Sequence, residues 1–257
     1  MKAKLTLALG LVLLGGCVTE RSGTQLPEPS IEEAARLNYE LGYRYFLQGD
    51  LPEAQAKLEK AIDQNPKLAE AHTALAMVYE RLGDREAAER QYRRSVSLSP
   101  KNPDAIEALA VYLCRSGGRE QEALREFDRA IAIPLSVHFT DKAALLANAG
   151  VCAKRVDLAK AEEYLRLALR SNPGYAEALL QLADVAYRRE HHLQARAFLE
   201  RYLGVSEPNP AALWLGVQIE QALGDVQAAS RYAAELKSRF PESAETSQLL
   251  ERERNAG

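Results

Sequence analysis

A period of 34 residues runs through most of this 257-residue chain and constrains its fold more than any other feature. Turn-forming pairs recur at spacings of 34, 34, 39, 34 and 34 residues. They are Gly49-Asp50, Gly83-Asp84, Gly117-Gly118, Val156-Asp157, Glu190-His191 and Gly224-Asp225. Prolines close the units at Pro66, Pro100, Pro134, Pro173 and Pro241, with Glu207-Pro208 at the remaining place. A fixed period of this length indicates a stack of similar small units.

The first unit shows how each period is expected to fold. Gly42 and Ala54 are small, as expected where two antiparallel helices approach closely, and Tyr45 fills the space beside them. Gly49 turns the chain after the first helix, and Pro66 stops the second because it cannot donate a backbone hydrogen bond. This helix–turn–helix period resembles the tetratricopeptide repeat. The resemblance implies an all-α fold, a right-handed superhelix of six tetratricopeptide repeats.

Two places depart from the period. In the third unit, Glu122 stands where alanine is usual, with Ala123 beside it. Five extra residues lie between the third and fourth units, in the connection over 134–141, which contains the apolar residues Val137 and Phe139. An apolar loop of this kind either packs on the array or contacts a partner, and packing is the expectation favoured here.

The N-terminus carries a secretory signal. Lys2 and Lys4 precede a short apolar run that is below the ~20 residues of a membrane-spanning helix. The run ends in Leu14-Gly15-Gly16-Cys17, which resembles the bacterial lipobox, so Cys17 is expected to become the lipidated N-terminus. Val18 follows where an Asp would favour the inner membrane, which predicts the periplasmic face of the outer membrane. The alternative is an ordinary signal peptide with a cysteine by chance.

These boundaries divide the chain into four parts. Residues 1–16 are the expected signal peptide, and the polar stretch 17–30, with two prolines, is a flexible tether. Residues 31–241 hold the six repeats, and 242–257 form a polar capping helix that frays. Loss of Lys2 and Lys4 lowers the 33 basic residues to 31 against 36 acidic ones. This acidic balance argues against nucleic acid or anionic lipid as a ligand.

No motif in the sequence indicates catalysis. The chain contains no Gly-rich phosphate loop, no His-Glu-x-x-His and no Gly-x-Ser-x-Gly. Adjacent His191 and His192 sit at a turn, but no cysteine or third histidine lies nearby to complete a metal site. The expectation is therefore a protein that is not an enzyme, with no cofactor, no metal and no small-molecule substrate.

Stacked helical hairpins form a concave surface lined by their first helices, and such surfaces bind protein segments. Helical spacing places Tyr39, Tyr43 and Phe46 on one face of the first helix, away from Leu41 and Tyr45, which should carry the hairpin contact. Three aromatic side chains on the groove face would form an anchor patch. Equally, the tether or the next unit covers them. The same face in this and neighbouring units carries Arg36, Met77, Arg81 and Arg115.

Two cysteines remain once Cys17 carries lipid, and the periplasm is oxidising. Cys114 and Cys152 both lie late in the first helices of adjacent units. Because neighbouring first helices lie side by side, we expect a Cys114–Cys152 disulfide of structural character. The alternative is two buried free thiols.

Beyond the generic repeat, the chain is similar to type IV pilus biogenesis lipoproteins of the PilF/PilW type. The similarity rests on Gly16-Cys17-Val18-Thr19, Tyr112-Leu113-Cys114, Asn148 to Cys152, Leu179 to Ala183, Leu213-Trp214-Leu215-Gly216, Leu223-Gly224-Asp225 and Arg239-Phe240-Pro241. It covers Cys17 to about Ser243, and the lengthened third connection falls where that family extends it. It implies an outer-membrane pilotin whose partner is the pilus secretin subunit. A lipoprotein adaptor that docks cell-wall enzymes or another outer-membrane machine remains the alternative, and a hydrolase with an atypical site is a distant third.

Overall fold

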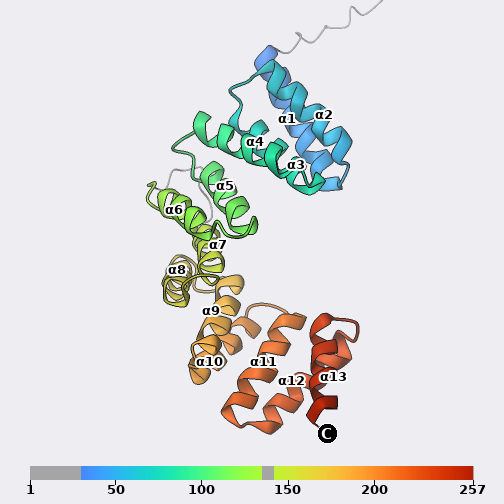
Figure 1. Cartoon of the computed structure of the whole chain (residues 1–257), viewed down its shortest axis with the longest axis vertical. Helices are drawn as coiled ribbons and strands as arrows, with labels where there is room; N and C mark the ends of the chain where they lie inside the picture. The colour runs from blue at the N-terminus through green and yellow to red at the C-terminus, as the bar shows by residue number, and fades with distance from the viewer. Residues whose placement is uncertain (1–29, 135–141, 257) are drawn as a thin grey trace, which may run out of the picture.

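The computed structural model describes residues 30–134 and 142–256, and the described chain is helical throughout (Figure 1). Its helices, in chain order, are α1 (Ile31–Gln48), α2 (Leu51–Gln64), α3 (Ala69–Leu82), α4 (Arg85–Leu98), α5 (Pro103–Arg115), α6 (Glu120–Ile131), α7 (Lys142–Ala153), α8 (Leu158–Ser171), α9 (Ala176–Arg188), α10 (His192–Leu203), α11 (Pro210–Leu223), α12 (Val226–Arg239) and α13 (Ala244–Ala256). The predicted all-α class is confirmed.

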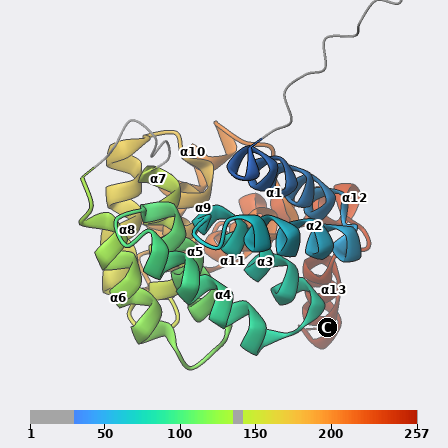
Figure 2. The same cartoon turned by 90° about the horizontal axis from the view of Figure 1, so that it is seen from above.

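Helices α1 to α12 pair into hairpins, α1 with α2 through α11 with α12, and each hairpin packs on the next. Figure 1 shows the hairpins stacked along the long axis of the molecule from α1 to α13, and Figure 2, from above, shows that the stack winds as a superhelix. First helices of adjacent repeats lie beside one another, since α1 contacts α3, α3 contacts α5 and α5 contacts α7. This arrangement places the exposed faces of the first helices along a shared surface.

Glycine and aspartate build the turn inside three of the repeats. Gly49, Gly83 and Gly224 end their helices in the left-handed conformation, at φ 84°, 82° and 76°. The next residue is an aspartate whose carboxylate accepts a hydrogen bond from the backbone of the following helix, as Asp50 does from Glu53. Glu190 occupies the corresponding place in the fifth repeat with φ 62°, a conformation that costs a side-chain-bearing residue about 1–2 kcal/mol.

Close helix approach explains the small residues of the first and fourth repeats. A Cβ atom on Gly42 would lie 2.6 Å from Leu58 Cγ and 3.1 Å from the carbonyl oxygen of Ala54. Gly150 has the same relation to Leu165 in the fourth repeat. The expected hairpin contact of Leu41 is wrong, because this side chain is 43 % exposed.

The third repeat has a longer turn than the alignment of Gly117-Gly118 with Gly83-Asp84 implied. Both glycines are left-handed, at φ 71°, and one further residue, Arg119, precedes α6. Ala123 therefore takes the fully buried position that Ala54 and Ala88 occupy in the first two repeats, and Glu122 does not occupy it. The apparent mismatch at Glu122 is thus a one-residue shift of register.

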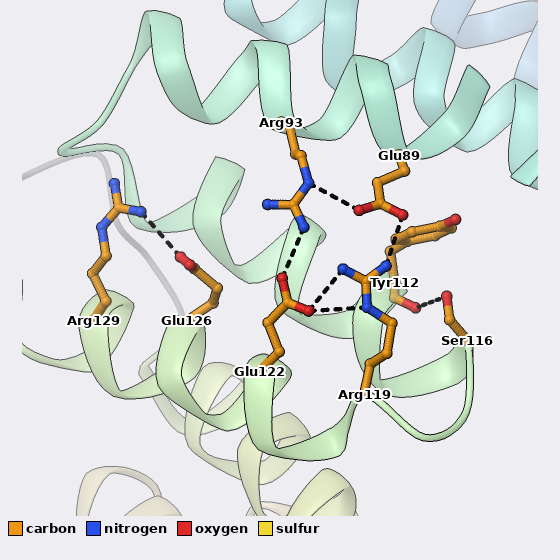
Figure 3. A network of polar contacts seen from close by, with 8 residues as sticks. All are labelled: Glu89, Arg93, Tyr112, Ser116, Arg119, Glu122, Glu126 and Arg129. Atoms are coloured by element: carbon orange, nitrogen blue, oxygen red, sulfur yellow. Dashed lines mark hydrogen bonds and ion pairs between the residues drawn. The ribbon is translucent and has the colours of Figure 1, made fainter. Parts of the chain in front are cut away.

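Glu122 takes part in a polar network between α4 and the start of α6, drawn in Figure 3. Arg119 Nη1 lies 2.7 Å from Glu89 Oε2, and Arg119 Nη2 lies 2.7 Å from Glu122 Oε2. Arg93 bridges the same two carboxylates, at 2.9 and 2.8 Å. Hydrogen bonds from Arg119 hold the pKa of Glu89 below its ordinary value, and hydrogen bonds from Arg93 do the same for Glu122. The network ties the second helices of adjacent repeats together.

We expect this network to make stability sensitive to acid. Because both folded-state carboxyl pKa values are lowered, its stabilisation is present above the unfolded pKa, near 4.5, and is lost as pH falls through the folded value. Glu122→Gln should lower the free energy of unfolding by about 1 kcal/mol at pH 7 and by nothing near pH 3. Urea unfolding at both pH values checks this, and an equal loss at both would contradict it.

A disulfide joins Cys114 of α5 to Cys152 of α7, with a Cα–Cα distance of 5.9 Å. This is the pair expected from the sequence. Arg155, in the turn that follows α7, adds a second tie to α5, because its Nη1 donates a 2.8 Å hydrogen bond to the carbonyl oxygen of Cys114. The disulfide therefore links two neighbouring first helices across the longest connection of the array.

The C-terminal end of the array is capped. Leu249 of α13 is buried beside Leu213, Val217 and Leu236, and the Arg252 guanidinium lies 4.7 Å from the centre of the Trp214 ring. Helix α13 continues to Ala256, but Glu251 to Asn255 are exposed, so the buried apolar contact of this helix lies at Leu249.

Within the described residues, the N-terminal end of the array is uncovered. Leu37 and Leu41 of α1 are 52 % and 43 % exposed, whereas Ala71 and Leu75, one period later, are buried. In the second repeat, α2 packs on α3 and covers Ala71 and Leu75. In the first repeat, none of the described elements precedes α1 to cover Leu37 and Leu41 in the same way.

Several expectations concern residues that the structure does not describe. These are the signal peptide 1–16, the lipidated Cys17 with nearly all of the tether 17–30, and most of the connection over 134–141. No helix in the described ranges is both long and apolar enough to cross a bilayer.

Candidate functional site

A groove of about 570 Å³ opens where the first helices of the first three repeats meet. Helices α3 and α5 supply eight of its eleven lining residues, and α1, α4 and α7 supply one each. The lining residues are Phe46, Met77, Glu80, Arg81, Tyr92, Asp104, Glu107, Ala108, Val111, Arg115 and Asn148. Four predicted residues, Phe46, Met77, Arg81 and Arg115, are therefore brought together in one groove.

Arginines at the C-terminal ends of α3 and α5 frame one end of this groove. Arg115 Nη1 pairs with Glu80 Oε1 at 3.0 Å. Arg81 donates a 3.1 Å hydrogen bond to the carbonyl oxygen of Phe46, and its guanidinium lies 5.2 Å from the centre of the Phe46 ring. Tyr92 donates to Glu80 Oε2 at 3.0 Å, and burial, followed by the charge of Glu80, raises the pKa of its hydroxyl. These contacts hold the first three repeats in one relative position.

Three aromatic residues of α1 form a stacked row, and the last of them, Phe46, lines the groove. Ring centres are 6.3 Å apart for Tyr39 and Tyr43, and 6.2 Å apart for Tyr43 and Phe46. Tyr39 and Phe46 pack partly against the cluster that includes Leu75 of α3, whereas Tyr43 is 36 % exposed. The next repeat therefore covers Tyr39 and Phe46 in part, whereas the role of the row as an anchor patch stays a prediction.

Arg36 is exposed and does not line the groove. It lies close enough to Tyr39 to oppose the rise in the pKa of that hydroxyl, a rise that burial causes. Arg36 thus stands beside the aromatic row and apart from the other predicted arginines.

Sequence reasoning missed the contribution of α5. Asp104, Glu107, Ala108 and Val111 share a helix face with Arg115, at offsets of three or four residues along the chain. Extending the face of Arg115 back along its helix would have found them. Asn148, also missed, donates a 2.8 Å hydrogen bond from Nδ2 to Glu107 Oε1 and so joins α7 to the groove.

The chemistry of the site is that of binding. In the ranges the structure describes, no three histidine, cysteine or carboxylate side chains converge on a metal position. His191 is exposed, and the ring of His192 lies tilted against that of Tyr187, with ring centres 5.6 Å apart. An apolar floor with charged ends suits a protein segment.

Comparison with known proteins identifies repeat families and solved structures that are similar to this chain. Residues 42–83 match a TPR repeat family, and residues 69–112 and 153–212 match tetratricopeptide repeat families. The type IV pilus assembly protein PilF of Pseudomonas aeruginosa is 27 % identical over 244 residues, which cover 93 % of each chain. The crystal structure of PilW, a widely conserved type IV pilus biogenesis factor, superposes with a TM-score of 0.77 at 28 % identity, over 84 % of this chain and 98 % of PilW.

The chain is a tetratricopeptide-repeat protein of the PilF/PilW type. The structure of PilF from Pseudomonas aeruginosa shares the fold, with a TM-score of 0.75 at 24 % identity, over 87 % of this chain and all of that one. Tetratricopeptide-repeat proteins of the PilF/PilW type are typically scaffolds without enzymatic activity, in keeping with the binding groove described above.

Proposed function

We propose that this protein acts in type IV pilus biogenesis as a lipid-anchored outer-membrane pilotin. In this role it binds the pilus secretin subunit and promotes its assembly into a ring. Similarity to PilF and PilW over nearly the whole repeat array supports the pilus role. The observation that carries the binding role is the groove over three repeats, into which Phe46, Met77, Arg81 and Arg115 converge.

The mechanism requires positioning and no chemical step. A secretin subunit crosses an aqueous compartment with apolar surface exposed, and the groove covers part of that surface. A lipid on Cys17 then confines the complex to the bilayer and raises the local concentration of subunits there. Assembly proceeds because subunits meet at the membrane more often than in solution.

The location of the protein rests on Cys17. We expect Cys17→Ala to remain soluble in the periplasm or held at the inner membrane as a precursor, because the acyl chains that make a stable anchor are missing. Fractionation of the cell envelope checks this. Normal levels of the variant in the outer-membrane fraction would overturn the lipoprotein assignment.

The aromatic row of α1 meets the groove at Phe46, so its residues provide a test of the binding role. Combined replacement of Tyr39, Tyr43 and Phe46 by serine should reduce the secretin captured from solubilised outer membranes. Because Tyr39 and Phe46 also pack on α3, the single change Tyr43→Ser gives the cleaner result. It should weaken capture about five- to thirtyfold, the effect of losing an aromatic hot spot worth ~1–2 kcal/mol.

Leu37→Ser is the matched control, since Leu37 is an exposed apolar residue of the same helix that belongs neither to the aromatic row nor to the lining of the groove. It should leave capture unchanged, and both variants should keep the far-ultraviolet signal of the helices. Full capture by the triple variant would show that secretin binds elsewhere. Capture of cell-wall enzymes in place of secretin would replace the proposed function with the adaptor role.

A further inference from the structure

Charge is separated along the groove. Arg81 and Arg115 lie at the C-terminal ends of α3 and α5, whereas Asp104 and Glu107 come from the first half of α5. Apolar side chains, including Met77 and Val111, complete the lining. A bound segment therefore meets an acidic end, an apolar floor and a basic end.

The basic end is already satisfied within the protein. Arg115 is paired with Glu80, and Arg81 is held by the backbone and ring of Phe46. Arg115 thus already has a carboxylate partner, and Arg81 already has an acceptor in the carbonyl oxygen of Phe46. Recruitment of an acidic segment at this end would compete with contacts that the folded protein makes itself.

The acidic end differs at Asp104. Its backbone N–H donates to Asn102 Oδ1 at 2.9 Å, but no lysine or arginine of the described chain forms an ion pair with its carboxylate. Asp104 is exposed in the first turn of α5, and partial desolvation raises the pKa of its carboxyl. Its carboxylate is accessible from the groove, and a cationic group of a bound segment would form the ion pair that the described chain does not supply.

We propose that the groove selects an extended protein segment in which a lysine or arginine adjoins apolar residues. The cation pairs with Asp104, and the apolar side chains cover Met77, Ala108 and Val111. The volume of about 570 Å³ falls in the ~300–1,000 Å³ range of sites that enclose small ligands. This inference rests on the proposed function and specifies the chemistry of the segment that the partner inserts.

Selection from a displayed library of random peptides on the purified protein tests the proposal. Enriched peptides should carry a lysine or arginine next to two or more apolar residues. Asp104→Asn should weaken their binding about fivefold, and Asp104→Lys should shift the enrichment toward acidic residues. The matched control is Asp63→Lys, an exposed change on α2 outside the groove, which should leave the enrichment as it was.

Three results would overturn the proposal: no enrichment, enrichment of acidic peptides by the unaltered protein, or the same cationic enrichment with Asp104→Lys. Far-ultraviolet spectra of each variant establish that the helices are intact. The test also separates this inference from the function on which it rests. If changes at Asp104 do not affect secretin capture, the pilotin role is retained and this inference is rejected. If the groove selects cationic peptides but the protein does not capture secretin, the groove chemistry is retained and secretin is rejected as the partner.

Discussion

Replacement of Cys114 and Cys152 by alanine is expected to lower the free energy of unfolding of the central repeats by about 4 kcal/mol. The two residues are 38 positions apart, and the chain-entropy model gives a stabilisation of that size for a loop of this length. The loop contains the longest connection of the array, where the 34-residue period is broken. In the unfolded state the disulfide therefore constrains the segment in which the repeat pattern is interrupted.

Hydrogen exchange of α5 to α8, with urea unfolding, measures this loss. Single replacement of either cysteine should give nearly the same loss as the double replacement, because one change already removes the bond. Thiol counting on the denatured, unreduced mature protein provides the chemical control, with none of the two repeat cysteines expected to react. Two reactive thiols would show that the bond is absent from the protein as isolated.

Gly150→Val should destabilise the fourth repeat by about 3 kcal/mol. A Cβ atom at this position would lie 2.6 Å from Leu165 Cγ, and Leu165 is itself fully buried. The added side chain must therefore push α7 and α8 apart, and overpacking of this kind costs ~1–3 kcal/mol or more. Thermal unfolding followed by circular dichroism detects the loss.

Gly174→Ala is the matched control, because a Cβ atom there would meet nothing closer than Asn172 Oδ1 at 3.8 Å. It should leave the melting temperature within error of the unaltered protein. Equal effects of the two changes would show that the approach of α7 to α8 does not limit the residue at position 150.

The period predicted the hairpins well because it reports local chemistry. Gly49, Gly83 and Gly224 mark the turns, since their left-handed backbone is costly for other residues. Gly42 marks the close approach of two helices for an equally local reason. The shift at Ala123 was missed because one residue added to a turn leaves the overall spacing of the prolines and glycines almost unchanged.

The candidate site was predicted only in part, since its shape depends on how repeats stack. Helical spacing placed Phe46, Met77, Arg81 and Arg115 on the right surface. It did not show that Tyr39 and Phe46 would be half covered by α3, nor that Asp104 would lie at the other end of the same groove. These facts follow from contacts between residues of different repeats, which no single period contains.

Because the N-terminal end of the described array is uncovered, the first hairpin is the least stabilised part of a nearly one-dimensional stack. Each interior hairpin is held by two neighbours, and α13 serves as the second neighbour of the last, but among the described elements α3 alone packs on the hairpin of α1 and α2. The first hairpin can therefore open at a free energy below that of the whole protein. A segment bound from Phe46 to Asp104 would bridge α1 and α5 and add to the free energy of that opening. Occupancy of the groove would then appear as slower amide exchange in α1 and α2, at residues that the segment never touches.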